Sequence, residues 1–222
     1  MKAMQMGSKS FVHLLGAAAA AVIWLGASPA SAQSCPAGTA VDAEPAGDTI
    51  AGDLAPGTGG AVFTAGSIAV TCGTSHTSGA LPTTGNPGDP VAGTLTPATF
   101  TSCTSSIGFS ATTTTNSTNG SWGLSATCGN QASLHIPRAG AVTRVATCTI
   151  TVAPTAGIDI PATIVPGVDG APPQLVIDTT VPIARSGLLC PNASTARFQA
   201  TYNVTDLTNP DATVSFTEVP AP

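Results

Sequence analysis

The sequence predicts an all-β protein, either an antiparallel β-sandwich or a Greek-key, barrel-like fold, with about ten short strands and disulfide staples. Three observations lead to this fold class. Apolar and polar residues alternate with a period of two, turn-forming residues separate the alternating runs, and six cysteines follow an export signal. Beyond residue 32 no run has the periodicity of an amphipathic helix.

The clearest alternation lies between Ala196 and Val204, and it recurs around residues 212–217, 122–126, 68–70 and 150–152. Successive side chains of a strand point to opposite faces, so one face of each run belongs to the core. The residues expected to be buried are Phe198, Tyr202, Val214 and Phe216. Those expected to be exposed are Arg197, Gln199, Thr213 and Thr217.

Turn residues divide these runs. Asn119-Gly120 is a favoured two-residue turn and predicts a hairpin between residues 109–115 and 121–128. Ala65-Gly66 predicts a second turn, and residues 137–140 and 209–211 predict two further breaks.

The N-terminus has the features of a removable export signal. Lys2 and Lys9 accompany an apolar stretch from residue 11 to 27, and Ala30 and Ala32 fit the small-x-small cleavage rule. We expect residues 1–32 to be a signal peptide and residues 33–222 to be a single secreted domain, extracellular or associated with the cell wall. A membrane anchor would need a longer apolar stretch, and lipidation of Cys35 would leave an odd number of cysteines.

The six cysteines are expected to form disulfides. Cys72, Cys128 and Cys148 are in phase with apolar neighbours, whereas Cys35, Cys103 and Cys190 lie near strand ends or loops. Spacing does not choose among the possible connectivities. The preferred pairing joins each core-facing cysteine to one of the others: Cys72–Cys103, Cys148–Cys190 and Cys35–Cys128.

The net charge of the mature chain disfavours some classes of binding partner. After cleavage at Ala32 the four arginines, at positions 138, 144, 185 and 197, face eleven carboxylates, a net charge of −7. This balance disfavours nucleic acid and anionic lipid headgroups. The expected partner is an extracellular protein or an envelope component, and no transmembrane anchor is expected in the mature chain.

Catalytic motifs are missing from the sequence. There is no GxSxG nucleophile elbow and no CxxC metal pair, and His76 and His135 stand apart from the cysteines. His135 alternates with Leu134 and Ile136 and is expected to be solvated. Four acidic residues could supply the paired carboxylates of a glycosidase: Asp159, Asp169, Asp178 and Glu218. The three aspartates among them could instead supply oxygen ligands to a calcium ion. We assign no catalytic, cofactor-binding or metal-binding residue.

Modification signals are abundant but simple. The Thr-rich run from Thr112 to Thr115 suits O-glycans. Four asparagines begin N-x-Ser/Thr sequons: Asn116, Asn119, Asn192 and Asn203.

Four segments together resemble a group of secreted, Thr/Gly-rich, β-rich proteins of actinobacteria that has no established activity. They are residues 93–103, the run Thr112–Thr115 leading to Trp122-Gly-Leu124, residues 134–140 and residues 148–154. The resemblance implies an exported protein of the cell-envelope space, and it implies no functional residues.

The function predicted from these features is a non-enzymatic structural or interaction role outside the cell or in its envelope. A secreted hydrolase with dispersed acids is one alternative, and a small-ligand or glycan-binding module is another. Acids converging on His76 or His135 would favour the enzyme, and an exposed aromatic platform would favour the glycan binder. A continuous apolar patch would favour a protein partner.

Overall fold

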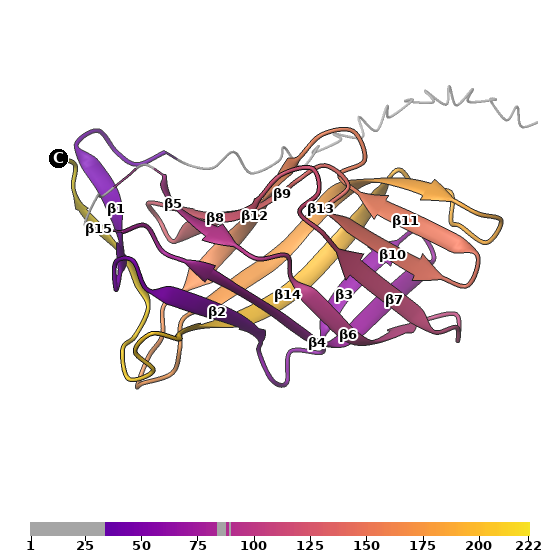
Figure 1. Cartoon of the computed structure of the whole chain (residues 1–222), viewed down its shortest axis with the longest axis horizontal. Coiled ribbons are helices and arrows are strands. Elements are labelled where there is room, and N and C mark those ends of the chain that lie inside the picture. Colours follow the sequence, from indigo (N-terminus) through magenta and orange to yellow (C-terminus); the bar gives the residue numbers. More distant parts are fainter. Residues whose placement is uncertain (1–33, 84–87, 89) are drawn as a thin grey trace, which may run out of the picture.

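The computed structural model describes residues 34–83, 88 and 90–222 (Figure 1). Within them the chain forms fifteen β-strands, and no helix there is long and apolar enough to cross a bilayer. The expected signal peptide and its cleavage site lie outside the described residues, so both stay predictions.

Most strands belong to one large sheet. Three are long and continuous: β4 (Ile68–Ala80), β13 (Gln174–Ser186) and β14 (Thr195–Asp206). Ten shorter strands follow one another end to end in pairs: β2 (Thr49–Leu54) with β3 (Ala61–Ala65), β5 (Val91–Leu95) with β6 (Thr99–Ser105), β7 (Ala111–Thr115) with β8 (Trp122–Thr127), β9 (Gln131–Ile136) with β10 (Ala141–Val145), and β11 (Cys148–Val152) with β12 (Ile158–Val165).

The pairing closes this sheet into an eight-strand antiparallel barrel. Each end-to-end pair acts as one barrel strand. Strands β5 and β6 both pair with β4. On one side of the waist β8 pairs with β9 and β9 with β12, and on the other side β7 pairs with β10 and β10 with β11. Strand β13 pairs with β11 and β12, and β14 pairs with β13, β2 and β3. Strands β2 and β3 then close the ring on β4.

The barrel confirms an all-β, disulfide-linked protein and corrects the finer prediction. Strands adjacent in the ring follow one another along the chain, so the architecture is an up-and-down barrel and neither a sandwich nor a Greek key. The predicted number of about ten short strands is too low: the structure has fifteen, because five of the eight barrel strands are interrupted and two further strands lie outside the barrel.

Five interruptions form what we call the waist: residues 55–60, 96–98, 116–121, 137–140 and 153–157. Four of them lie in neighbouring barrel strands, and residues 55–60 lie on the other side of the continuous strand β4. A proline stands in four of them, and proline cannot donate to a β-ladder. Backbone hydrogen bonds connect neighbouring interruptions. Asn116 N donates to Gly140 O at 2.9 Å, and Ala139 N donates to Ala153 O at 2.8 Å.

The hairpin predicted at Asn119-Gly120 is wrong. Strand β7 pairs with β10, whereas β8 pairs with β5 and β9, so residues 116–121 carry one barrel strand across the waist. The side-chain amides of Asn116 and Asn119 donate to the carbonyls of Ala139 and Arg138, at 3.1 and 2.9 Å. These hydrogen bonds join the interruption at 116–121 to the interruption at 137–140. The turn predicted near Gly66 is confirmed, since Ala65 pairs with Ile68.

The two ends of the barrel differ (Figure 1). At the hairpin end lie four connections: residues 66–67, 106–110, 146–147 and 187–194. At the ribbon end, β1 (Thr39–Glu44) and β15 (Ser215–Pro220) form a separate two-stranded ribbon. Val41 exchanges two backbone hydrogen bonds with Gly88, and Glu218 Oε1 accepts one from Gly129 N at 2.8 Å.

The predicted strand phases are largely confirmed. Tyr202 and Val214 are buried, and Arg197, Thr213 and Thr217 are exposed. Phe198, Phe216 and Gln199 are each intermediate, contrary to expectation. Phe198 lines an internal cavity, and Phe216 lies on the ribbon outside the barrel wall.

Three disulfides join the preferred partners, Cys35–Cys128, Cys72–Cys103 and Cys148–Cys190. In each pair the cysteine expected to face the core is buried and its partner is half-buried. The first bridge ties the start of the described chain to the end of β8. The second joins β4 to β6, and the third anchors the connection at 187–194.

Candidate functional site

The barrel interior contains a cavity of about 100 Å³. All thirteen strands of the barrel sheet contribute to its lining. The lining residues are almost all apolar: Ile50, Ala51, Gly52, Ala61, Phe63, Val70, Cys72, Thr77, Leu95, Ala98, Phe100, Thr113, Trp122, Leu124, Leu134, Ile136, Ala141, Thr143, Val152, Ile160, Leu175, Ile177, Val181, Phe198, Tyr202 and Val204. The cavity therefore extends to both sides of the waist.

Small residues leave this space open. Gly52, Ala61, Ala98 and Ala141 line the cavity with a hydrogen atom or a single methyl group each. Protein interiors hold few voids larger than a water molecule, and one water needs only about 10–15 Å³. The space is therefore well beyond a packing defect of one water.

Aromatic residues form part of the wall. The rings of Phe100 and Phe198 meet edge to face, with centroids 6.5 Å apart and an interplanar angle of 77°. Trp122 also lines the cavity, and its Nε1 donates to Asn116 O at 2.9 Å. The indole is thereby held by the waist with its polar group satisfied.

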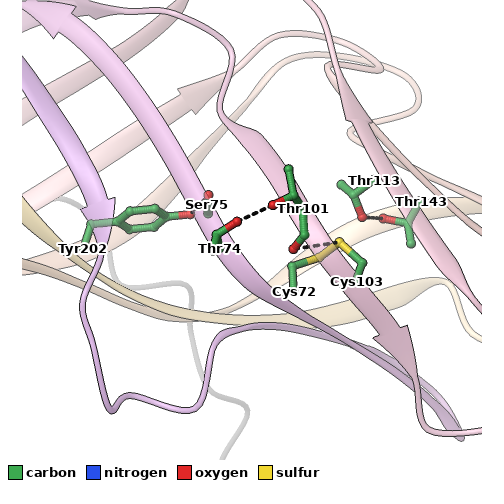
Figure 2. Close-up of a disulfide and its surroundings, with 8 residues drawn as sticks. All are labelled: Cys72, Thr74, Ser75, Thr101, Cys103, Thr113, Thr143 and Tyr202. Carbon is green, nitrogen blue, oxygen red and sulfur yellow. Dashed lines mark hydrogen bonds between the residues drawn. A yellow bond between two sulfur atoms is a disulfide. The ribbon is translucent and has the colours of Figure 1, made fainter.

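Two pairs of hydroxyl groups are hydrogen-bonded in the barrel interior (Figure 2). The hydroxyls of Tyr202 and Ser75 lie 2.9 Å apart, and those of Thr113 and Thr143 lie 3.0 Å apart. Burial raises the pKa of Tyr202 to about 12, although the bond to Ser75 opposes this shift. No charged side chain of the described chain lines the cavity.

Ser75 faces inward because β4 changes phase. Cys72 points into the barrel, so regular alternation would turn position 75, three residues later, outward. The change occurs at Gly73 and Thr74, opposite Ser102, whose φ is +53°. A positive φ at a non-glycine residue is uncommon and has no signal in the sequence. The inward direction of Ser75 therefore could not be predicted from the sequence.

The structure brings His76 and His135 each against one carboxylate on the outer wall. His76 Nδ1 lies 2.7 Å from Asp53 Oδ1, and His135 Nδ1 lies 2.8 Å from Asp159 Oδ1. Both pairs sit at directly paired strand positions and are about half exposed. The His135 ring lies against Gly157, where an added Cβ would meet Nε2 at 3.2 Å.

These pairs are exposed on strands and lie outside the cavity lining. A hydrolytic triad needs a nucleophile on the free ring nitrogen of the base. No hydroxyl of the described residues is hydrogen-bonded to either imidazole. The exposure of His135 confirms the sequence expectation, whereas its pairing with Asp159 came from strand register and could not be read from sequence.

The other candidate acids are not brought together. Asp178 accepts two hydrogen bonds from Arg197, at 2.7 and 2.6 Å, and this interaction lowers its pKa. Glu218 binds a backbone amide near Cys128, and Asp169 lies in the connection between β12 and β13. Across residues 34–83, 88 and 90–222, no three His, Cys, Asp or Glu residues are grouped to hold a metal ion.

Asp48 and Asp206 form an acid pair that the sequence did not predict. Desolvation raises the pKa of Asp48, and a hydrogen bond and repulsion from Asp206 add to the rise. Asp206 is buried and also accepts the amides of Thr208 and Asn209, at 2.8 and 2.9 Å. This pattern is that of a turn cap after β14. Neither carboxylate lines the cavity.

No protein-family model matches the chain, and no curated protein or solved structure matches it significantly.

Proposed function

We propose that the protein is an exported, non-enzymatic binding protein whose barrel interior holds a neutral apolar molecule. One observation carries the proposal: the interior cavity of about 100 Å³, to which every strand of the barrel sheet contributes and whose lining is almost entirely apolar. Ligand sites are typically concave and mostly apolar, with a few polar groups.

The chemistry of the lining restricts the ligand. An apolar cavity stays dry and binds apolar molecules of matching size. The hydroxyls of Tyr202 and Ser75 are already hydrogen-bonded to each other, as are those of Thr113 and Thr143. A charged group inside the barrel would have no partner and would be strongly disfavoured. A narrow, uncharged hydrocarbon chain or a small apolar molecule fits best.

Access is expected at the ribbon end. At the hairpin end, buried residues outside the cavity lining close the barrel: Ala65, Ile68, Val145, Ile150 and Ile183. At the other end, Val41 and Ala43 of the ribbon belong to the same buried cluster as the barrel wall. The ribbon thus covers the barrel as a separate element, and its displacement would open a path.

Two observations support export and the lack of catalysis. Three disulfides and no free cysteine among the described residues favour an oxidising compartment. The two His–Asp pairs are exposed and lie apart from the cavity, which weakens the hydrolase alternative.

The test is a binding titration followed by the fluorescence of Trp122, the one tryptophan beyond residue 32. The ligands are straight-chain primary alcohols of increasing length and the carboxylates of the same lengths. We expect saturable binding of the alcohols that strengthens with chain length, and much weaker binding of the carboxylates. Absence of saturable binding across the series would overturn the proposal.

Two neighbouring variants localise the ligand. Ala61→Leu narrows the cavity and should weaken binding by at least about tenfold. Val62→Leu adds bulk to the next position, outside the cavity lining, and should leave binding unchanged. Equal effects of the two variants would place the ligand outside the barrel.

A further inference from the structure

Four of the seven exposed large apolar side chains of the described chain lie at the hairpin end of the barrel, whereas Val165, Val168 and Leu207 lie toward the ribbon end. Ile107 and Phe109 lie in the connection between β6 and β7 and are 42% and 50% exposed. Leu188 and Leu189 lie in the connection between β13 and β14 and are 97% and 49% exposed. Large apolar side chains exposed at the same end of a molecule indicate an interaction site.

Positive charge accompanies them. Arg144 is one residue from the end of β10, and Arg185 is one residue from the end of β13. Arg185 donates to the neutral groups Ala193 O and Asn192 Oδ1, so no carboxylate neutralises it. Neither arginine forms an ion pair within the described chain.

Negative charge gathers at the opposite end. The four connections of the hairpin end contain no Asp or Glu. Seven carboxylates lie on the ribbon or in the segments next to it and in the connection between β12 and β13: Asp42, Glu44, Asp48, Asp169, Asp206, Asp211 and Glu218. The charge of the chain is therefore unevenly distributed. The hairpin end carries arginines and apolar side chains, and these seven carboxylates lie toward the opposite end.

We propose that the hairpin end docks on an anionic lipid surface. The two apolar connections stand on opposite sides of the eight-strand ring and project from the same end (Figure 1). A flat partner reaches both at once. Shallow insertion of apolar side chains and attraction of arginines to anionic headgroups act together at a bilayer interface. The acidic ribbon end then points away from the lipid.

This docking is independent of the cavity, so it goes beyond the proposed function. Its test is co-sedimentation of the protein, produced from the complete coding sequence, with vesicles. One set contains phosphatidylglycerol in phosphatidylcholine, and the other contains phosphatidylcholine alone. We expect binding to the first set that weakens as salt rises, and little binding to the second.

Matched variants assign the contact. Leu188→Ser combined with Leu189→Ser should weaken binding at least about tenfold, since both side chains would insert. Val168→Ser changes an apolar residue that is 71% exposed in the connection between β12 and β13, and it should have no effect. Arg144→Gln should weaken binding about fivefold, whereas Arg138→Gln, at the waist, should change it little.

Thermal melting of each variant shows that the fold is intact. Three results would overturn the proposal. They are no binding to anionic vesicles, equal binding to both vesicle sets, or an effect of Val168→Ser as large as that of the leucine pair. The first result, with the apolar residues still exposed, would point to a protein partner at this end.

Discussion

The hydroxyls of Ser75 and Tyr202 meet at 2.9 Å inside the barrel, one from β4 and the other from β14. These strands lie on either side of β2 and β3, so the bond spans the barrel wall from within. Tyr202 lines the cavity, and within the described chain its hydroxyl is hydrogen-bonded to Ser75.

A mutant cycle should show this dependence. Ser75→Ala leaves the Tyr202 hydroxyl buried without a partner and should cost about 1–3 kcal/mol of unfolding free energy. Tyr202→Phe likewise leaves the Ser75 hydroxyl buried without this hydrogen-bond partner. The double variant should lose less stability than the sum of the two single losses. Chemical denaturation measures all three, and strictly additive losses would contradict the bond.

Tyr202 should also make stability fall at alkaline pH. Its folded-state pKa of about 12 lies above the ordinary tyrosine pKa of 10.0, because burial disfavours the phenolate. A raised pKa means that the stabilisation is complete below about pH 10 and is lost as pH rises toward 12. The loss amounts to at most about 3 kcal/mol.

The measurement of this effect is simple, since Tyr202 is the one tyrosine of the chain. Its phenolate absorbance should appear only near the folded-state pKa or on unfolding. Tyr202→Phe should remove the corresponding part of the alkaline loss of stability. Titration of the folded protein with an unshifted midpoint would show that the side chain is open to solvent.

Gly187 is predicted to be irreplaceable at the start of the connection that holds Cys190. Its φ is +118°, and an added Cβ would lie 1.9 Å from Thr147 O. Gly108, in the connection between β6 and β7, also has a positive φ, of +80°, but an added Cβ there meets no atom within 4 Å. Gly187→Ala should therefore cost about 1–3 kcal/mol more than Gly108→Ala. Equal melting temperatures for the two variants would contradict the close approach.

The Cys35–Cys128 bridge is expected to hold the ribbon over the barrel. Replacing both cysteines with serine removes a tie across 93 residues and should cost about 2–4 kcal/mol. If the ribbon covers the entrance, the same variant should bind and release an apolar alcohol faster than the wild type. Stopped-flow fluorescence of Trp122 gives both rates. Unchanged rates in a destabilised variant would place the entrance elsewhere.

The sequence predicted those parts of the fold that depend on local pattern. The alternation around Tyr202 and Val214 gave the correct faces, and the phase of Cys72, Cys128 and Cys148 marked the buried half of each disulfide. Residues 116–121 misled because Asn-Gly has the same appearance in a tight hairpin and in a waist crossing. Strand pairing decides between the two, and pairing is a long-range property.

The candidate site was the least predictable part. The cavity depends on how thirteen strands meet around one axis, so no short segment marks it. Its alanines and glycines have the same appearance in the sequence as packed small residues. Ser75 faces inward only through the change of phase at Gly73, and the His–Asp pairs depend on register. These features follow from closure of the barrel.

The most direct test of ligand binding in the barrel is NMR of the protein mixed with a long-chain primary alcohol. Intermolecular NOEs between the alkyl protons and the side chains of Leu134, Val181 and Tyr202 are predicted, because all three line the cavity. NOEs confined to exposed residues such as Phe109 and Leu188, or no intermolecular NOEs at saturating alcohol, would contradict a ligand held inside the barrel.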